Sequence, residues 1–444
     1  MTAPRVTAPQ PTDYLGVVWA LAGVEGVRIV GHGASGCSFY DYLGLRDLQP
    51  ARWPLPLFSA GFEEADVGLG GEDRLAQAVL EVDRVYRPEV IALVNVTVGG
   101  LMGADPVALA RELAPQVRAR IVSFAGGGYR GPYTVGEAEA LAVLAAEVVE
   151  KGPSRSRPAA PGDGAARRGG PVVNLIGATW ETFNWASDRA EIERLLALLG
   201  VRVGTVLSAG TSVAALRRAG AAHLNLVVRD VGLEAAEVLK ARFGTPYLYG
   251  LPFGAEGTRT WLEEVAGVLG VGPAREALEC DLRRYRIDFC TLSPWRGMHH
   301  HLRLAICAPY DYALGLTQLL AGEWGLPVEL VALPVPPLGP GHDPAGDAVR
   351  RLKGAGAARV QVAPGEDGLA AALADLQPHI LLGSSEDEQL APQTLVHVRA
   401  SFPSWDRMHF HDGTPFVGPR GSRYLAQVLA NDMLAALARG QRPE

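Results

Sequence analysis

Short apolar runs alternate with segments of helical period along the first third of the chain. Residues 27–30, 90–96 and 121–124 are largely apolar and are expected to be strands, and a glycine-rich segment follows each of them. The run at residues 90–96 is of the buried parallel-strand type. This repeated order of strand, glycine-rich turn and helix predicts a parallel sheet covered by helices. The expected helices are one that opens at residues 70–73 and two that span residues 106–113 and 138–149.

The same alternation continues through the rest of the chain. Apolar runs predict strands of a second unit at residues 172–177, 201–207 and 224–228, and of a third unit at residues 302–307, 328–333, 359–362 and 379–382. Residues 151–171 are rich in Pro, Gly and Arg and lack an apolar period, which is typical of a flexible surface linker. We therefore predict an α/β fold of three consecutive Rossmann-like domains with parallel sheets flanked by helices. Their boundaries are residues 1–150, 172–293 and 294–444, the last with a C-terminal helix.

Composition narrows the classes of function. The 444 residues carry a formal net charge of −7, which argues against a nucleic-acid or anionic-membrane partner. No apolar run approaches the ~20 residues of a membrane span, and the polar N-terminus lacks the apolar core of a signal peptide. The four cysteines, Cys37, Cys280, Cys290 and Cys307, are scattered and form no CxxC pair. We expect a protein of the reducing cytoplasm, without a disulfide framework.

Several motifs are weak or missing. No GxxxxGK[ST] segment occurs, so this chain is not expected to bind ATP itself. His299, His300 and His301 are consecutive, and their side chains could not all face one ion from a strand, so we expect a solvated loop. Cys280, Cys290 and Cys307 are expected to pack in or near the core.

Cys37 stands apart from the other cysteines because it follows the first strand in a glycine-rich turn, after Gly33 and Gly36. A buried free cysteine is one interpretation of this pattern. The other is a thiolate presented to a bulky group, because glycine allows close approach. Ligands of such sheets collect at the carboxyl ends of the strands, where Cys37, Thr97 and the loop that contains Gly127 are all expected.

A series of loose motifs occurs in one order along residues 13–431. They are residues 32–37, 58–59, 66–71, 126–131, 174–177, 225–227, 252–254 with Thr258, 380–383, and 402–403 with Asp406 and Arg407. Together they resemble the catalytic-component subunits of nitrogenase and its relatives. Those relatives include dark-operative protochlorophyllide reductase, the reductase of nickel-tetrapyrrole synthesis, the methylthio-alkane reductases and the cofactor-assembly scaffolds. The ending at residues 402–409 is most similar to the β-type subunits.

The resemblance implies a [4Fe–4S] cluster shared with a partner subunit, with Cys37 as the metal ligand of this chain. Gly33, Gly36, Thr97 and Gly127 are the residues expected to lie against that cofactor; no catalytic residue is indicated. The resemblance also implies an α-type partner in an α2β2 assembly and a separate iron–sulfur reductase, which alone binds ATP.

The departures from the family pattern bear on the cluster. Two further cluster cysteines of the family fall at Thr97 and near Thr12, and the cysteine that holds the active-site cofactor of nitrogenase falls near Arg229. This chain therefore offers one thiolate, which suits a four-iron cluster completed by cysteines of a partner.

Three hypotheses remain at this point. The first is a β-type subunit of a nitrogenase-like reductase that relays low-potential electrons to a substrate in its partner. The second is a scaffold subunit for assembly of a nitrogenase-type cofactor. The third is a non-redox module that binds a small molecule. The sequence leaves the substrate open.

Overall fold

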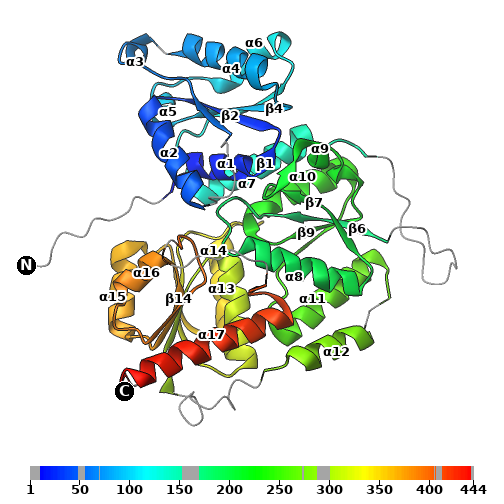
Figure 1. The fold of residues 1–444 in the computed structure, drawn as a ribbon, viewed down its shortest axis with the longest axis vertical. Helices are drawn as coiled ribbons and strands as arrows, with labels where there is room; N and C mark the ends of the chain where they lie inside the picture. Colours follow the sequence, from blue (N-terminus) through cyan, green and yellow to red (C-terminus); the bar gives the residue numbers. More distant parts are fainter. Residues whose placement is uncertain are drawn as a thin grey trace, which may run out of the picture. The chain divides into compact units, whose positions relative to one another are not determined.

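The computed structural model describes residues 11–48, 56–69, 71–152, 170–272, 275–287, 301–404, 406 and 413–441. The chain divides into two compact units (Figure 1). The first is formed by Met1–Arg155, Val173–Glu181 and Gly204–Tyr247, and the second by Ser156–Val172, Thr182–Val203 and Leu248–Glu444. The strands form three sheets of four or five strands, which follow one another along the chain as the apolar runs predict. A pair of two-residue strands, β1 (Val24–Glu25) and β8 (Thr211–Ser212), forms a fourth sheet. The α/β fold is thus confirmed, and the domain boundaries stay a prediction.

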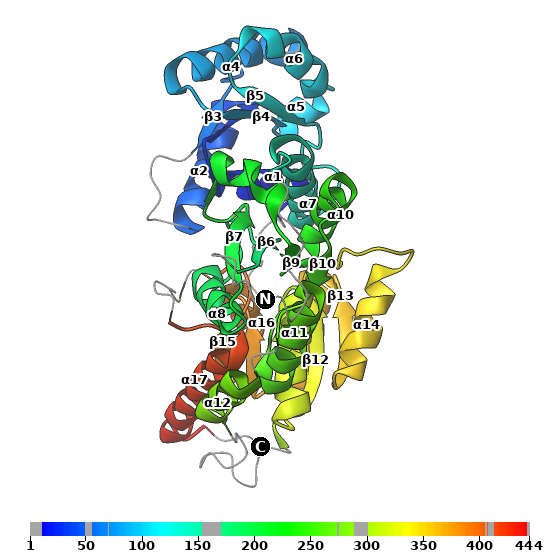
Figure 2. The same cartoon turned by 90° about the vertical axis from the view of Figure 1, so that its right-hand side faces the viewer.

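The first sheet has the strand order β3-β2-β4-β5, and all its neighbouring strands are parallel. Its strands are β2 (Val27–His32), β3 (Leu57–Ser59), β4 (Val90–Asn95) and β5 (Arg120–Phe124). Helices α4 (Glu72–Tyr86) and α6 (Pro106–Leu113) cover one face, and α1 (Asp13–Ala22) and α7 (Tyr133–Val143) lie on the other (Figure 2). Leu75, Val79 and Leu113 pack against Ile91 and Leu93 of β4, so the helical period seen in the sequence is the core-facing stripe.

Two predicted turns of this sheet are helices instead. Cys37 lies in the first turn of α2 (Ser35–Leu48), and Thr97 is the first residue of the short helix α5 (Thr97–Leu101). Helix α3 (Asp66–Leu69) is also short. The glycines suggested turns, but a single glycine weakens a helix by only about 1 kcal/mol, which tertiary packing readily offsets. Helix α1 was not predicted, although Thr12 and Asp13 before an apolar run are a start signal.

The second sheet has the order β10-β9-β6-β7. Its strands are β6 (Val172–Ile176), β7 (Arg202–Leu207), β9 (Leu224–Val227) and the unpredicted β10 (Tyr247–Tyr249). Strands β6 and β9 are parallel, with Asn174 opposite Asn225. The amide Nδ2 of Asn174 donates to Oδ1 of Asn225 at 2.8 Å, which links these two polar side chains inside the buried ladder. The helices of this region are α8 (Trp185–Leu198), α9 (Val213–Arg217) and α10 (Leu233–Phe243).

The third sheet, β13-β12-β11-β14-β15, is parallel throughout. Its strands are β11 (Leu304–Cys307), β12 (Val328–Leu333), β13 (Ala357–Val362), β14 (Ile380–Gly383) and β15 (Val396–Arg399). Its helices are α13 (Tyr310–Thr317), α14 (Pro344–Gly354), α15 (Gly365–Leu376) and α16 (Ser385–Leu390). The second unit also holds α11 (Gly254–Leu269), α12 (Arg275–Tyr285) and α17 (Gly418–Ala438). The sequence did not predict β15, α12 or α14, because polar residues interrupt their apolar patterns.

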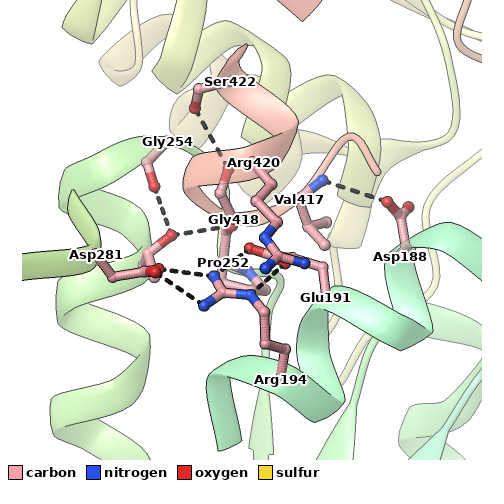
Figure 3. Close-up of polar contacts among 11 residues, drawn as sticks. Asp188, Glu191, Arg194, Pro252, Gly254, Asp281, Val417, Gly418, Arg420 and Ser422 are labelled. Carbon is pink, nitrogen blue, oxygen red and sulfur yellow. Dashed lines mark hydrogen bonds and ion pairs between the residues drawn. The ribbon is translucent and has the colours of Figure 1, made fainter. Parts of the chain in front are cut away.

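The start of α17 is fixed by acidic side chains of α8 (Figure 3). Oδ1 of Asp188 accepts the backbone N–H of Phe416 at 2.7 Å and that of Val417 at 3.3 Å. These N–H groups lie where a helix begins and need acceptors from outside the helix. Arg194 bridges Glu191 of the same helix to Asp281 of α12, with both N–O distances at 2.7 Å. Three helices that are distant in sequence are thereby joined.

Asp188 makes this anchoring depend on pH. Burial raises the pKa of Asp188 to about 7, although the two N–H groups oppose the shift. Because the folded-state pKa is the higher one, the contribution of Asp188 is complete below about pH 4 and is lost as the pH rises through 7. We expect Asp188→Asn to gain stability relative to the wild type between pH 4 and 7, by up to about 1.4 kcal/mol per pH unit. Urea unfolding of both proteins at each pH measures this, and a constant difference would contradict it.

Candidate functional site

The carboxyl edge of the first sheet gathers the predicted site segments. Strand β2 ends at His32, which pairs with Asn95 at the end of β4, and Val94 pairs with Phe124 at the end of β5. The three strands are parallel, so the segments that follow them leave the sheet at one edge. As the sequence predicts, Cys37, Thr97 and Gly127 therefore belong to neighbouring segments.

Cys37 lies at the open start of α2. Its backbone N–H donates to the carbonyl of Ala34 at 3.2 Å, and its side chain is partly exposed. A Cβ placed on Gly36 would meet no atom within 4 Å. A bulky group could thus approach beside the thiol without moving the backbone, as the glycine-rich sequence suggested.

Gly33 and Gly127 allow the segments that follow β2, β4 and β5 to pack closely against one another. A Cβ on Gly33 would lie 2.7 Å from Cβ of Val96, and the Gly33 carbonyl accepts the hydroxyl of Ser59 at 3.1 Å. Gly127 has a φ of +67°, and a Cβ there would lie 2.9 Å from Cα of Gly100. These two glycines fix how the segments after β2, β4 and β5 meet, and Gly127 is buried.

Thr12 and Thr97 lie next to the same glycine. A Cβ on Gly128 would be 3.2 Å from Oγ1 of Thr12 and 3.3 Å from Oγ1 of Thr97. The hydroxyl of Tyr129 donates to the carbonyl of Thr97 at 3.3 Å. The two residues near which the resemblance places further cluster cysteines are thus close in space, on the edge that carries Cys37.

Two acidic residues at this edge, the buried Asp13 and the partly buried Asp41, were not predicted from the sequence. Oδ1 of Asp13 accepts the N–H of Arg130 at 3.1 Å, which ties the start of α1 to the loop after β5. The hydroxyl of Tyr14 donates to Oδ2 of Asp41 at 2.5 Å. Burial, then Asp41 and finally Cys37 raise the pKa of Tyr14, and burial raises the pKa of Asp41. Asp41 follows Cys37 by four residues, so the pair braces the first turns of α2 from one face.

Large apolar side chains are exposed on these same segments. Phe39 and Tyr40 on α2 are 57% and 75% exposed, Leu101 at the end of α5 is 72% exposed, and Tyr129 is 55% exposed. Aromatic side chains are enriched in protein–protein contacts. We call Phe39, Tyr40, Leu101 and Tyr129 the apolar rim.

The predictions for the other cysteines are confirmed only in part. Cys307 is buried in β11, as predicted, but Cys280 is exposed on α12, where Leu278 and Leu282 occupy the buried face. His301 is exposed. Cys290, His299 and His300 lie outside the described residues. The described part of the chain contains no group of three or more His, Cys, Asp or Glu side chains that could hold a metal ion.

Arg229 occupies the carboxyl end of β9 in a buried ion cluster. Its guanidinium contacts Glu181 at 2.8 Å and Glu137 at 3.6 Å, and the hydroxyl of Thr179 donates to Glu137 at 2.5 Å. Burial and the neighbouring Glu181 raise the pKa of Glu137 well above its usual range. The guanidinium of Arg229 is thus fixed near the position at which the resemblance places a cofactor cysteine.

Comparisons with known proteins agree with this architecture. Residues 12–434 match the family described as nitrogenase component 1 type oxidoreductase. One subunit of the light-independent protochlorophyllide reductase of Rhodospirillum rubrum is 27% identical over 383 residues, which are 85% of this chain and 66% of that protein. The corresponding subunit of Methylobacterium radiotolerans is 28% identical over 268 residues, 59% of this chain and 47% of that protein. The chain thus spans about half to two thirds of the length of these relatives.

A solved structure shows the same fold. The structure named "Nitrogenase Cp1 at pH 6.5" superposes with a TM-score of 0.78 and 18% sequence identity, over 100% of this chain and 96% of that one. Within the part of the chain that the structure describes, every helix is too short or too polar to span a bilayer. The family match covers nearly the whole chain, and we conclude that this protein belongs to the nitrogenase component 1 type oxidoreductase family.

Proposed function

We propose that this chain is the β-type subunit of a nitrogenase-like reductase complex and that Cys37 ligates a [4Fe–4S] cluster shared with an α-type partner. The observation that carries the proposal is the position of Cys37, partly exposed beside open space at Gly36 on an edge formed by three strand ends. A four-iron cluster needs four ligands, and this edge supplies one thiolate. The partner supplies the others.

The residues around Cys37 have separable roles in this proposal. Gly33 and Gly127 hold the three loops in contact, and the Tyr14–Asp41 pair braces α2, so the thiol keeps a fixed direction. The apolar rim is the contact surface for the partner, whose approach excludes water from the shared site. When bound, the cluster would supply one-electron transfer at low potential.

Family membership supports the wider complex that we propose. The electrons come from a separate iron–sulfur reductase that binds and hydrolyses ATP, and the substrate lies in the partner subunit. We propose an α2β2 assembly in the cytoplasm, and three domains in this chain with the boundaries given above. The relatives compared above are subunits of protochlorophyllide reductases, so a tetrapyrrole is the first substrate to test.

Iron and sulfide analysis of the complex tests the proposal. The chain is co-purified with its partner without oxygen, and electron paramagnetic resonance is recorded after reduction with dithionite. We expect about four irons per subunit pair and loss of most iron and of the signal in Cys37→Ala. Cys280→Ala, a change at an exposed cysteine on α12, is the matched control and should retain both. An iron-free complex, or a signal unchanged in Cys37→Ala, would overturn the assignment of Cys37 as a cluster ligand.

A further inference from the structure

A cavity of about 350 Å³ is lined by α16, by the segment that joins it to β15, by β15 itself and by Asp406. Its volume is at the lower end of the range of small-molecule sites. The polar residues that line it are Ser385, Glu388, Gln389, Thr394, His397 and Asp406. All belong to the second unit, and the function proposed above uses none of them.

Two buried polar atoms of the lining lack partners. His397 is only 6% exposed, and its Nε2 has no hydrogen-bond partner among the described residues; the same holds for Oγ1 of Thr394. Nδ1 of His397 faces the guanidinium of Arg399, which can only donate, and also lies 3.4 Å from Oε2 of Glu388. From the contact with Arg399 we infer that Nδ1 accepts and that Nε2 carries the proton. A buried donor without an acceptor is costly, and a ligand oxygen would relieve that cost.

The charged side chains that line the cavity disfavour an inorganic anion as its ligand. Arg399 is buried behind the cavity and its donors are occupied: it pairs with Glu388 and Asp406 and contacts His397. The Arg399 guanidinium lowers the pKa of Asp406, so that carboxyl stays ionised. Two carboxylates thus face one guanidinium, and the lining residues include no Lys or Arg. An inorganic anion would meet net negative charge here, whereas an ammonium group would be attracted.

We propose that this cavity binds a small zwitterion of amino-acid size. Its carboxylate accepts hydrogen bonds from Nε2–H of His397 and from the Thr394 hydroxyl, and its ammonium group lies near Glu388 and Asp406. The carboxylate of the ligand thus satisfies the two donors of the cavity, and its ammonium group satisfies the acidic side chains. No metal ion is required, and the described residues contain no cluster that would hold one.

Isothermal titration of the full chain tests this with defined probes. Each of the common L-amino acids, inorganic phosphate and methylammonium is titrated separately. We expect saturable binding of at least one amino acid and none of phosphate. Thr394→Val and His397→Leu should each weaken that binding about tenfold, the effect of losing a hydrogen bond to a charged group. His342→Leu, at an exposed histidine, should leave it unchanged.

Three results would overturn the proposal. They are the absence of binding by every amino acid, competition by phosphate, and unchanged affinity in both lining variants. Thr394→Val removes one hydroxyl at nearly constant volume, so it keeps the test informative if His397→Leu fails to fold. Because iron content is measured on Cys37 variants, failure here is distinguishable from failure of the proposed function.

Discussion

Replacing Arg229 by Met is expected to cost about 3–5 kcal/mol of unfolding free energy, because it leaves buried carboxylates without their cation. Glu137 and Glu181 are both buried, and Arg229 is their shared partner at 3.6 and 2.8 Å. The remaining charge would have to be neutralised by protonation. The loss should therefore be largest at high pH and shrink as the pH falls, which urea unfolding at pH 5 and pH 8 would show.

The matched control is Arg217→Met. Arg217 also bridges an acid, Glu89 at 2.8 Å, but it is 41% exposed, so we expect a loss below about 1 kcal/mol. Converting Glu137 and Glu181 to Gln together with Arg229→Met should restore most of the stability, since an uncharged cluster of similar volume avoids the desolvation cost. Equal losses in the Arg229 and Arg217 variants would contradict the buried-cluster account.

Gly136→Ala should be nearly as damaging, at about 3 kcal/mol. A Cβ on Gly136 of α7 would lie 1.8 Å from the backbone oxygen of Asp13, and a Cβ on Gly16 of α1 would lie 1.8 Å from that of Tyr133. The two helices thus touch backbone to backbone at reciprocal glycines. The added methyl group would meet rigid backbone atoms and not a side chain that could move aside, so the two helices must separate. Thermal or urea unfolding measures the loss.

Gly267→Ala supplies the control of opposite sign. Gly267 lies inside α11, and a Cβ there meets no atom within 4 Å. We expect a gain of about 0.5–1 kcal/mol, because alanine loses less backbone entropy on folding. The double variant Gly16→Ala with Gly136→Ala should cost less than the sum of the single changes, since either one already parts the helices. A neutral Gly136→Ala would contradict the close packing.

The sequence alone determined the sheets and the edge at which the site lies. Runs such as residues 90–96 and 328–333 are wholly or largely apolar because both faces of a parallel sheet are buried, and β4 and β12 match them closely. Segments that follow parallel strands leave a sheet at the same edge, so the strand pattern was enough to place Cys37 and Thr97 on one edge. Only the structure shows that β2 and β4 are neighbouring strands. The motif order likewise indicated the family that the comparisons confirm.

The tertiary structure decided the partners of each polar group. Glu137, Glu181 and Arg229 come from three separate segments, and no periodicity relates them. The contact of Asp188 with the start of α17 also joins segments that no periodicity relates. Strand β15 was not predicted because His397 and Arg399 interrupt its apolar pattern. Local patterns report burial and backbone geometry, because these depend on neighbouring residues. Pairing of buried charges depends on long-range packing, which the sequence pattern does not encode locally.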